Sequence, residues 1–385
     1  MNRQLSQKLE RISQSNEKID VIELTNLLSL TNRSSITQIM QFASEIRDQH
    51  FHDQISYSRN VFIPLTRWCR NACGYCGFRK TEEPVFMAES EIDALLKLGK
   101  KSNCGEVLIT MGEKPEFCYE KVKIELKKRG YATSTELVKN ICARALDYRL
   151  LPHINPGVVD EQEMQVLRPF IASLGLMLES MDFQLGQKGS VHELSPTKNP
   201  NIRLRMIRKA GMLRIPFTTG LLIGIGESIQ SRAHSILEIR KLIQEFGHIQ
   251  EVIIQNFVPN STMTAKHLKA PSKREYLLVI ALMRILCPTM NIQAPPNLNK
   301  GNEKALIEAG INDWGGISPI TIDHINPSSL WPIESELRKI TEEAGFRMIF
   351  RLPVYEKFIS SQWLAEKPMS IAFSSQQGDS DSFSS

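Results

Sequence analysis

Short apolar runs alternate with amphipathic segments about eight times along the chain, and this alternation is what most limits the possible fold. The runs cover residues 60–65, 106–111, 151–155, 173–178, 217–225, 251–258 and 291–294, with a weaker one at 314–317. Strands that alternate with helices form parallel sheets, and a (β/α)8 barrel of the TIM type is the simplest closed arrangement. The sequence therefore predicts an α/β barrel. An open barrel of six strands with a C-terminal extension also fits, because the last two runs are weak.

The segments between the runs have helical periodicity. Ser90 is a candidate N-cap for a helix whose apolar positions are Ile92, Leu95, Leu96 and Leu98. Further helices are expected at residues 134–148, 201–210, 228–246 and 272–286. Before the barrel, residues 1–55 are predicted to form a helical extension. The barrel is expected over 56–355 and a C-terminal extension over 356–385, which is rich in Ser, Gln and Asp and expected to be disordered from about Met369.

Charge and hydropathy exclude several classes of protein. The net charge of +5 is spread thinly, and no long basic arm accompanies it, so no nucleic-acid partner is expected. The polar N-terminus lacks an apolar stretch long enough for a signal peptide, and no apolar run approaches the length of a membrane span. We expect a soluble, cytoplasmic protein with no membrane partner.

Three of the seven cysteines crowd into one short segment. Residues 67–80 read RWCRNACGYCGFRK, which places Cys69, Cys73 and Cys76 in a Cys-x3-Cys-x2-Cys spacing. A structural zinc site would need a fourth Cys or His nearby, usually from a second pair, and no second pair exists. Three thiolates suit a cubane iron–sulfur cluster with one iron left open. The other four, Cys104, Cys118, Cys142 and Cys287, are interpreted as ordinary thiols.

The spacing Cys-x3-Cys-x-aromatic-Cys, with Tyr75 as the aromatic residue, resembles the defining loop of the radical S-adenosylmethionine superfamily. The resemblance implies a 4Fe–4S cluster held by Cys69, Cys73 and Cys76, whose open iron is chelated by S-adenosyl-L-methionine. It also implies that an electron from the cluster cleaves this cofactor to methionine and a 5′-deoxyadenosyl radical. The protein would orient the cofactors and exclude water.

Two glycine-containing turns resemble cofactor-binding motifs of the same superfamily. Gly112 and Glu113 follow the second run, where the backbone and the carboxylate would hold the methionine ammonium. Gly224 and Glu227 follow the fifth run, where a glycine would let the backbone approach the adenine. An ordinary glycine-rich turn is the alternative for this second motif. Glu179, after the fourth run, is also a candidate for contact with the cofactor.

Polar residues recur where the predicted strands end. Because such positions converge on one mouth of a barrel, they predict a polar pocket for a hydroxyl-rich and nitrogen-rich small molecule. The candidate substrate residues are His153, Asn155, Gln255, Asn256 and Asp323, and Ser180, His324 and the loop residue His192 lie at related positions. Each of them could equally be a structural hydrogen-bond partner.

Residues 60–79, NVFIPLTRWCRNACGYCGFR, resemble a narrower group, the deazaflavin-forming 7,8-didemethyl-8-hydroxy-5-deazariboflavin synthase family. Segments 151–157, 174–180, 215–220 and 314–319 agree, and the resemblance spans about residues 56–355. It implies a lyase that abstracts a hydrogen from the hydroxybenzyl methylene of a tyrosine–ribitylaminouracil adduct, closes the ring and expels ammonia. It also implies two partners: a sister radical enzyme that supplies the adduct, and a flavodoxin- or ferredoxin-type reductant.

Other functions fit part of the pattern. The sister enzyme that forms the adduct, or a biotin-synthase-like relative, would share the cysteine loop, although Arg70, Asn71, Gly74 and Tyr75 favour the deazaflavin-forming family. A non-catalytic iron–sulfur carrier would be expected to have four cysteine ligands. A nucleic-acid-modifying radical enzyme would be expected to carry a further binding module. The sequence leaves open the acid and base residues, the oligomeric state and the identity of the electron donor.

Overall fold

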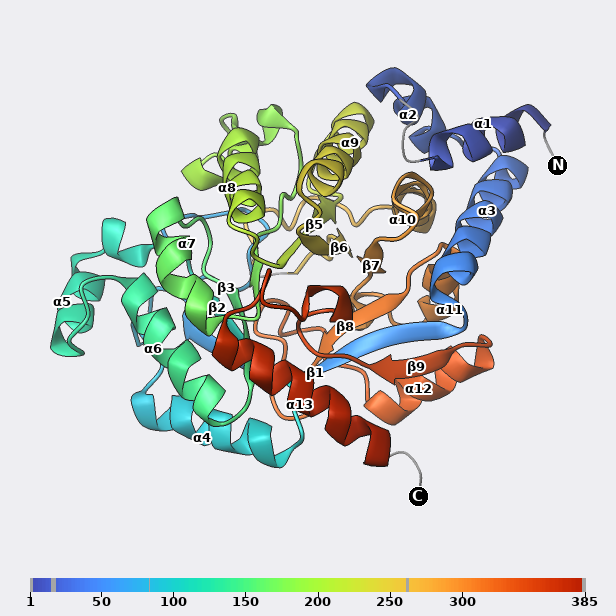
Figure 1. The fold of residues 1–385 in the computed structure, drawn as a ribbon. Coiled ribbons are helices and arrows are strands. Elements are labelled where there is room, and N and C mark those ends of the chain that lie inside the picture. The colour runs from blue at the N-terminus through green and yellow to red at the C-terminus, as the bar shows by residue number, and fades with distance from the viewer. Residues whose placement is uncertain (1–2, 15–18, 83, 261–262, 383–385) are drawn as a thin grey trace.

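A closed barrel of eight parallel strands forms the centre of the molecule (Figure 1). The computed structural model describes residues 3–14, 19–82, 84–260 and 263–382, with side chains as far as residue 376. The barrel strands are β1 (Gln54–Thr66), β2 (Glu106–Met111), β3 (Leu151–Asn155), β4 (Ser173–Gly175), β5 (Phe217–Ile223), β6 (Ile249–Asn256), β7 (Asn291–Gln293) and β8 (Asp313–Ile317). The predicted (β/α)8 barrel is confirmed, and the open six-stranded alternative is wrong.

The barrel closes through β1, which pairs with a strand on each side. Its second half pairs with β2, in the register Asn60 to Glu106, and its first half pairs with β8, in the register Ser58 to Gly316. The other neighbours follow chain order from β2 to β8. All the carboxyl ends of the strands therefore point to one mouth, where barrel sites are built.

Helices surround the barrel as the alternating pattern predicts. They are α4 (Glu89–Lys101), α5 (Glu120–Lys128), α6 (Ser134–Asp147), α7 (Glu161–Leu167), α8 (Pro200–Met212), α9 (Ile229–Phe246), α10 (Lys273–Leu286), α11 (Glu303–Glu308) and α12 (Glu334–Glu343). The expected cap at Ser90 is wrong: the N-cap is Ala88, two residues earlier, and the Glu91 carboxylate accepts from the Ala88 N–H at 3.0 Å. In contrast, Ser272 does cap α10, with Glu275 completing a capping box.

The N-terminal extension consists of three helices, as the sequence predicts. They are α1 (Arg3–Ser13), α2 (Val21–Leu28) and α3 (Arg33–Phe51). Helix α2 packs on α9, and α3 packs on α10 and α11, so the extension covers one side of the barrel rather than standing apart (Figure 1). Their buried leucines and isoleucines join the main apolar core. The boundaries between the extension, the barrel and the C-terminal region remain predictions.

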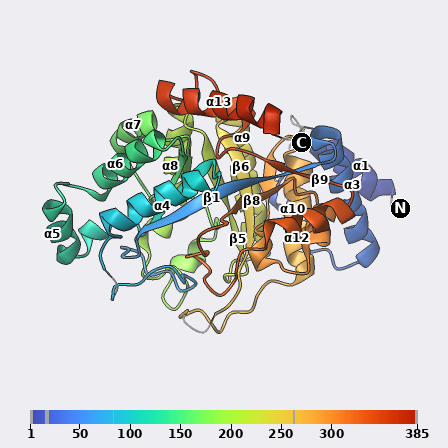
Figure 2. The ribbon, with the colours of Figure 1, turned by 90° about the horizontal axis from the view of Figure 1, so that it is seen from below.

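The C-terminal region contains two elements that the sequence analysis missed. Strand β9 (Arg347–Phe350) pairs in parallel with Gln54–Tyr57 at the start of β1. The expected disordered tail is instead α13 (Glu366–Ser382), in which Ile371 and Ala372 are buried in an apolar cluster with Leu146 and Leu151. Burial of these side chains offsets the entropy of ordering a polar segment. Figure 2 shows α13 across the end of the barrel opposite the loop after β1.

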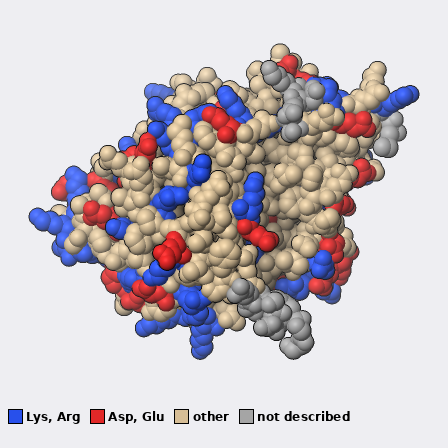
Figure 3. Space-filling view, in the orientation of Figure 1, with Lys and Arg blue, Asp and Glu red and all other residues tan. Residues whose placement is uncertain are grey.

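Charged side chains of both signs are interspersed over the face shown in Figure 3, with no large area of one sign. This agrees with the thin spread of charge expected from the sequence, and the absence of a nucleic-acid partner remains a prediction. Within the described residues, no helix combines the length and the apolar character needed to cross a membrane.

Candidate active site

The three clustered cysteines lie in the loop after β1, and all three line one cavity of about 340 Å³ at the mouth of the barrel. Backbone N–H groups point at the sulfur atoms of Cys69 and Cys76. The N–H groups of Asn71 and Glu113 donate to Cys69 Sγ at 3.4 and 3.2 Å, and the N–H of Arg79 donates to Cys76 Sγ at 3.4 Å. Such donors stabilise negative charge on sulfur, as a thiolate ligand requires.

Burial keeps the thiols of Cys69 and Cys76 protonated unless a positive partner binds beside them. Burial raises the pKa of Cys69 to about 12 and also raises the pKa of Cys76 above its ordinary value. A buried thiolate is stable beside a metal ion, which removes its proton outright. No three His, Cys, Asp or Glu side chains of the described residues converge on a single-ion site. All three cysteines line one cavity, as the ligands of a single cluster would have to.

The turn after β2 is locked against the cysteine loop. A Cβ at Gly112 would lie 1.9 Å from the Trp68 carbonyl oxygen, so only glycine allows this approach. One carboxylate oxygen of Glu113, Oε2, accepts from the Val158 N–H at 3.0 Å. The other, Oε1, is buried and has no hydrogen-bond partner among the described residues, and Glu113 lines the cavity. An unpartnered buried carboxylate oxygen beside the cysteines fits a ligand ammonium group.

Glu179 lines the same cavity, and so do Lys198 and Arg203, two cationic residues that were not predicted as site residues. Its carboxylate forms an ion pair with Lys198, and Arg203 Nη2 lies at 4.0 Å. Burial alone would raise the pKa of Glu179, but Lys198 and Arg203 hold it below its ordinary value. Its backbone has a φ of +66°, which is unusual for a side chain of this size and typical of functional sites.

Tyr75, which belongs to the cysteine loop, contacts the side chain of His192. The Tyr75 hydroxyl and His192 Nε2 are 2.9 Å apart, and the two rings meet edge to face. Burial, together with the charge of Lys198, lowers the pKa of His192 to about 3. The imidazole is therefore neutral at physiological pH. Tyr75 lines the cavity, and its role as a cofactor-binding residue remains a prediction.

The second predicted motif has a structural role in the described arrangement. The Glu227 carboxylate accepts from the N–H groups of Gly224 and Ile225 at 2.9 and 2.8 Å, and from Arg232 Nε at 2.6 Å. Neither Gly224 nor Glu227 lines this cavity or the adjoining one. The glycine has a φ of +99°, and the carboxylate holds the turn after β5 in place.

Four of the five candidate substrate residues face the barrel lumen. His153, Asn155 and Gln255 line the cysteine cavity and a second, adjoining cavity, and Asp323 lines the second. Asn256 is placed wrongly by the sequence analysis. Alternate residues of a strand face opposite sides, so Gln255 points inward and Asn256 points outward, where its Nδ2 donates to the Leu298 carbonyl at 3.2 Å.

His153 is held rigidly in the lumen. Its Nδ1 lies 2.6 Å from Ser173 Oγ, and a Cβ at Gly175 would lie 2.9 Å from its Nε2 and 1.9 Å from Asn155 Oδ1. Burial and the nearby charge of Arg351 lower the pKa of His153 to about 4. The ring is therefore a neutral hydrogen-bonding group in the lumen.

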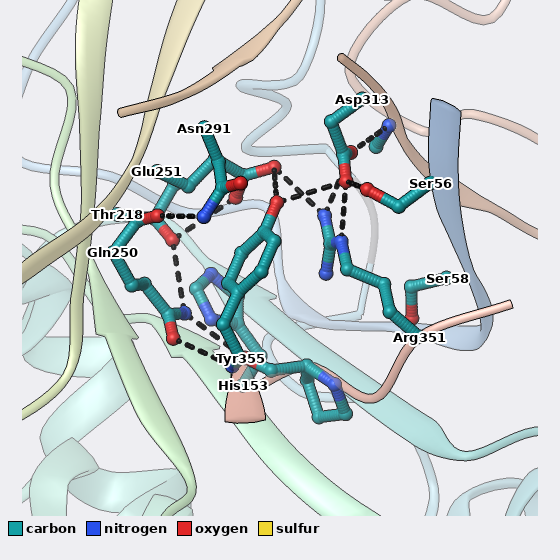
Figure 4. Close-up of polar contacts among 12 residues, drawn as sticks. Ser56, Ser58, His153, Thr218, Gln250, Glu251, Asn291, Asp313, Arg351 and Tyr355 are labelled. Carbon is teal, nitrogen blue, oxygen red and sulfur yellow. Dashed lines mark hydrogen bonds and ion pairs between the residues drawn. The ribbon is translucent and has the colours of Figure 1, made fainter. Parts of the chain in front are cut away.

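A buried ionic network closes the far end of the lumen, and the sequence analysis missed it (Figure 4). Arg351, from the segment after β9, donates to Asp313 at 2.6 and 2.9 Å and to Glu251 Oε1 at 2.8 Å. The Tyr355 hydroxyl donates to Asp313 at 2.8 Å. Glu106 accepts from Ser58 nearby. We call Glu106, Glu251, Asp313, Arg351 and Tyr355 the floor network.

One guanidinium shares the floor network with three buried carboxyl groups. Burial raises the pKa of Glu251 to about 7, against the attraction of Arg351, and burial raises the pKa of Glu106 as well. These carboxyls therefore hold protons more tightly than exposed ones do. Acidic residues within the first three positions of three apolar strands are the sequence signal that could have revealed the network.

The closed barrel, with three cysteines in the loop after its first strand and a cavity beside them, defines a radical S-adenosylmethionine barrel. The model of the Radical SAM superfamily accordingly matches residues 63–239. The 7,8-didemethyl-8-hydroxy-5-deazariboflavin synthase of Methanothermobacter thermautotrophicus is 45% identical over 316 residues, which cover 82% of this chain and 96% of that protein. The synthase of Methanococcus maripaludis strain C5 is 42% identical over 353 residues, covering 91% and 97%. The chain belongs to the 7,8-didemethyl-8-hydroxy-5-deazariboflavin synthase family.

Solved structures agree on the fold. Methylornithine synthase has a TM-score of 0.68 at 20% identity, covering 89% of this chain and 97% of that one. The FeFe-hydrogenase maturase of Carboxydothermus hydrogenoformans has a TM-score of 0.69 at 18% identity, covering 92% and 81%. At these identities the similarity shows the barrel alone. The family is enzymatic, which contradicts the alternative of a non-catalytic iron–sulfur carrier.

Proposed function

We propose that this chain converts the 5-amino-5-(4-hydroxybenzyl)-6-(D-ribitylimino)-5,6-dihydrouracil adduct to 7,8-didemethyl-8-hydroxy-5-deazariboflavin, with release of ammonia. The observation that carries the proposal is the high identity to synthases of that name over most of the chain. A lumen lined by neutral imidazole and amide side chains supports it, because a uracil and a ribityl chain need many hydrogen-bond partners.

The residues around the mouth would hold the two cofactors. Cys69, Cys73 and Cys76 would ligate a 4Fe–4S cluster, and Glu113 Oε1 would accept from the ammonium group of S-adenosyl-L-methionine. When bound, these cofactors supply a 5′-deoxyadenosyl radical that takes a hydrogen atom from substrate. Glu179, paired with Lys198 and lying after β4 at the same mouth, would contact the polar part of the cofactor.

The chain's own residues would position the adduct and protect the radical. Phe62, Leu222 and Ile253 line the space between the cysteines and the lumen, and apolar walls of this kind exclude water. His153, neutral and held by Ser173, offers a fixed hydrogen-bonding edge. Glu251 is a carboxyl in the lumen whose pKa lies near neutrality, so it can hold a proton for the ring-closing step.

The test is an anaerobic incubation of reconstituted, reduced enzyme with S-adenosyl-L-methionine and the adduct. We expect 5′-deoxyadenosine, methionine, ammonia and a fluorescent deazaflavin, with deuterium from the hydroxybenzyl methylene recovered in the deoxyadenosine. Cys73→Ala should abolish all products, whereas the buried, distant Cys142→Ala should retain them. Formation of the adduct from tyrosine and 5-amino-6-ribitylamino-uracil, with no deazaflavin, would contradict the proposal in favour of the sister activity.

Two partners follow from this function. A sister radical enzyme would supply the adduct, and a flavodoxin- or ferredoxin-type protein would deliver the electron. Both remain proposals that the same assay can address, by replacing the chemical reductant and the synthetic adduct with the two proteins.

A further inference from the structure

A second cavity, of about 160 Å³, lies in the lumen and is lined by Glu106, Glu251 and Arg351 of the floor network. The two cavities share Phe62, His153, Asn155 and Gln255 in their walls, so they adjoin each other. Pockets for whole drug-sized ligands usually have volumes of roughly 300–1,000 Å³. The inner cavity is therefore the size of one arm of a substrate whose remainder lies in the outer cavity.

Three buried polar atoms in the wall of the inner cavity lack hydrogen-bond partners among the described residues. They are Asn60 Oδ1 on β1, Asn297 Oδ1 after β7, and Trp331 Nε1 in the segment between β8 and α12. Asn60 is 1% exposed and Asn297 is 9% exposed, so water does not freely solvate them. Nearly all buried polar groups in proteins have a partner, so three that lack one around a single cavity point to a polar ligand.

Hydrogen bonds hold Asn297 in place, and a glycine on the neighbouring strand leaves room for Asn60. Asn297 Nδ2 donates to Asp323 Oδ2 at 2.8 Å and to the Ser329 carbonyl at 3.2 Å, which leaves its oxygen facing the cavity. A Cβ at Gly316 would lie 2.2 Å from Asn60 Nδ2, so the neighbouring strand leaves room for this amide only because residue 316 is glycine. The two hydrogen bonds of Asn297 Nδ2 preorganise its acceptor oxygen before a ligand arrives.

Resting on the proposed function, we infer that the inner cavity binds the polyhydroxylated ribityl arm of the substrate, with Asn60, Asn297 and Trp331 as its specificity-determining residues. A ligand in this cavity has to donate to the two asparagine oxygens and accept from the Trp331 N–H at the same time. Each hydroxyl can both donate and accept, so a polyol matches them whichever way an amide is turned. A uracil edge has only one N–H between its two carbonyls and cannot supply donors to both asparagines. The floor network then adds Arg351 and Glu251 at the closed end of the cavity.

The experiment compares two ligands in cluster-loaded, unreduced enzyme with S-adenosyl-L-methionine present. One is the adduct, and the other is an analogue whose ribityl arm is replaced by pentyl. Calorimetry under anaerobic conditions gives both dissociation constants without turnover. We expect Trp331→Phe, which removes the indole N–H and keeps an aromatic ring, to weaken the adduct about twofold to tenfold. Asn60→Leu should weaken it at least as much. Neither substitution should weaken the pentyl analogue.

Trp363→Phe is the matched control, because Trp363 packs on Phe358 in the C-terminal apolar cluster and does not line the cavity. It should leave both dissociation constants unchanged. If Trp331→Phe weakens both ligands equally, or if wild-type enzyme binds both equally, the ribityl assignment is wrong while deazaflavin formation can still stand. If the enzyme binds S-adenosyl-L-methionine but binds neither the adduct nor its pentyl analogue, the proposed function itself fails, and the inference fails with it.

Discussion

The backbone N–H of Glu113 donates to Cys69 Sγ at 3.2 Å, so the turn that follows β2 directly contacts a ligand in the loop that follows β1. The Arg70 N–H donates back to the Glu113 carbonyl at 2.9 Å. The candidate cluster ligand and the candidate cofactor carboxylate therefore form one rigid unit. Disturbing one side of this unit should disturb the other, and the first two predictions separate these effects.

Gly112→Ala should prevent this unit from forming. The added Cβ would overlap the Trp68 carbonyl oxygen at 1.9 Å, and a backbone carbonyl cannot move aside cheaply. We expect a large loss of iron and sulfide after reconstitution, measured by chemical analysis and by the visible absorbance of the cluster. The control is Gly186→Ala, where nothing lies within 4 Å of the added atom. Full cluster content in Gly112→Ala would show that the two loops need not touch.

Glu113→Ala should keep the cluster but weaken S-adenosyl-L-methionine binding. The substitution leaves the backbone N–H on Cys69 and removes the unpartnered carboxylate oxygen. A hydrogen bond to a charged group contributes about 1.5–3 kcal/mol, which is about tenfold to a hundredfold in affinity. Equilibrium binding measures the change, and the exposed Glu120→Ala on α5 serves as control. Wild-type affinity in Glu113→Ala would remove this residue from the cofactor site.

Arg351→Met should destabilise the fold strongly. It leaves Asp313 and Glu251 buried without the guanidinium that pairs with both of them, and breaking such a pair typically costs about 3–5 kcal/mol. Chemical denaturation measures the loss. Arg347→Met, four residues earlier on β9, breaks only an exposed ion pair with Asp53 and should cost little. Equal stability of the two variants would mean that the floor network contributes nothing to folding.

Glu251 should give the wild-type protein a measurable pH dependence of stability. Its folded pKa of about 7 lies above the ordinary value of 4.5, so the folded state binds the proton more tightly than the unfolded state. This contribution is fully present below about pH 4.5 and is lost as pH rises towards 7. Glu251→Gln cannot titrate. The stability of wild type relative to this variant should therefore fall across that interval and stay constant above it, in denaturation at a series of pH values. A flat difference would contradict the raised pKa.

The sequence predicted the barrel and the cysteine loop because both depend on local patterns. Apolar runs and helical periodicity locate the strands, and the spacing of Cys69, Cys73 and Cys76 lies within one loop. Asn256 shows that a position at the end of a strand does not by itself predict the direction of the side chain. Because side chains alternate along β6, Gln255 points inward and Asn256 points outward. The direction of one side chain depends on register, which the apolar pattern of β6 does not fix.

Residues that act across long stretches of chain were not predictable in this way. Arg351 meets Glu251 and Asp313 only because β9 pairs with the start of β1. Trp331 and Asn297 reach the inner cavity from irregular segments, which carry no periodic signal. The first α13 residues likewise are helical because of a cluster shared with Leu146 and Leu151, rather than because of their own composition.

The floor network also orders events during synthesis. Ribosomes release a chain from its N-terminus, so Glu251 and Asp313 emerge before the arginine that pairs with both of them. Until residue 351 is free of the ribosome, a nascent barrel must either keep these carboxyls protonated or leave its end open to water. The segment that excludes water from the lumen is thus translated after all eight barrel strands. A chain that stalls before Arg351 would have unpaired carboxyl groups in a lumen open to water, and proteases could reach it there.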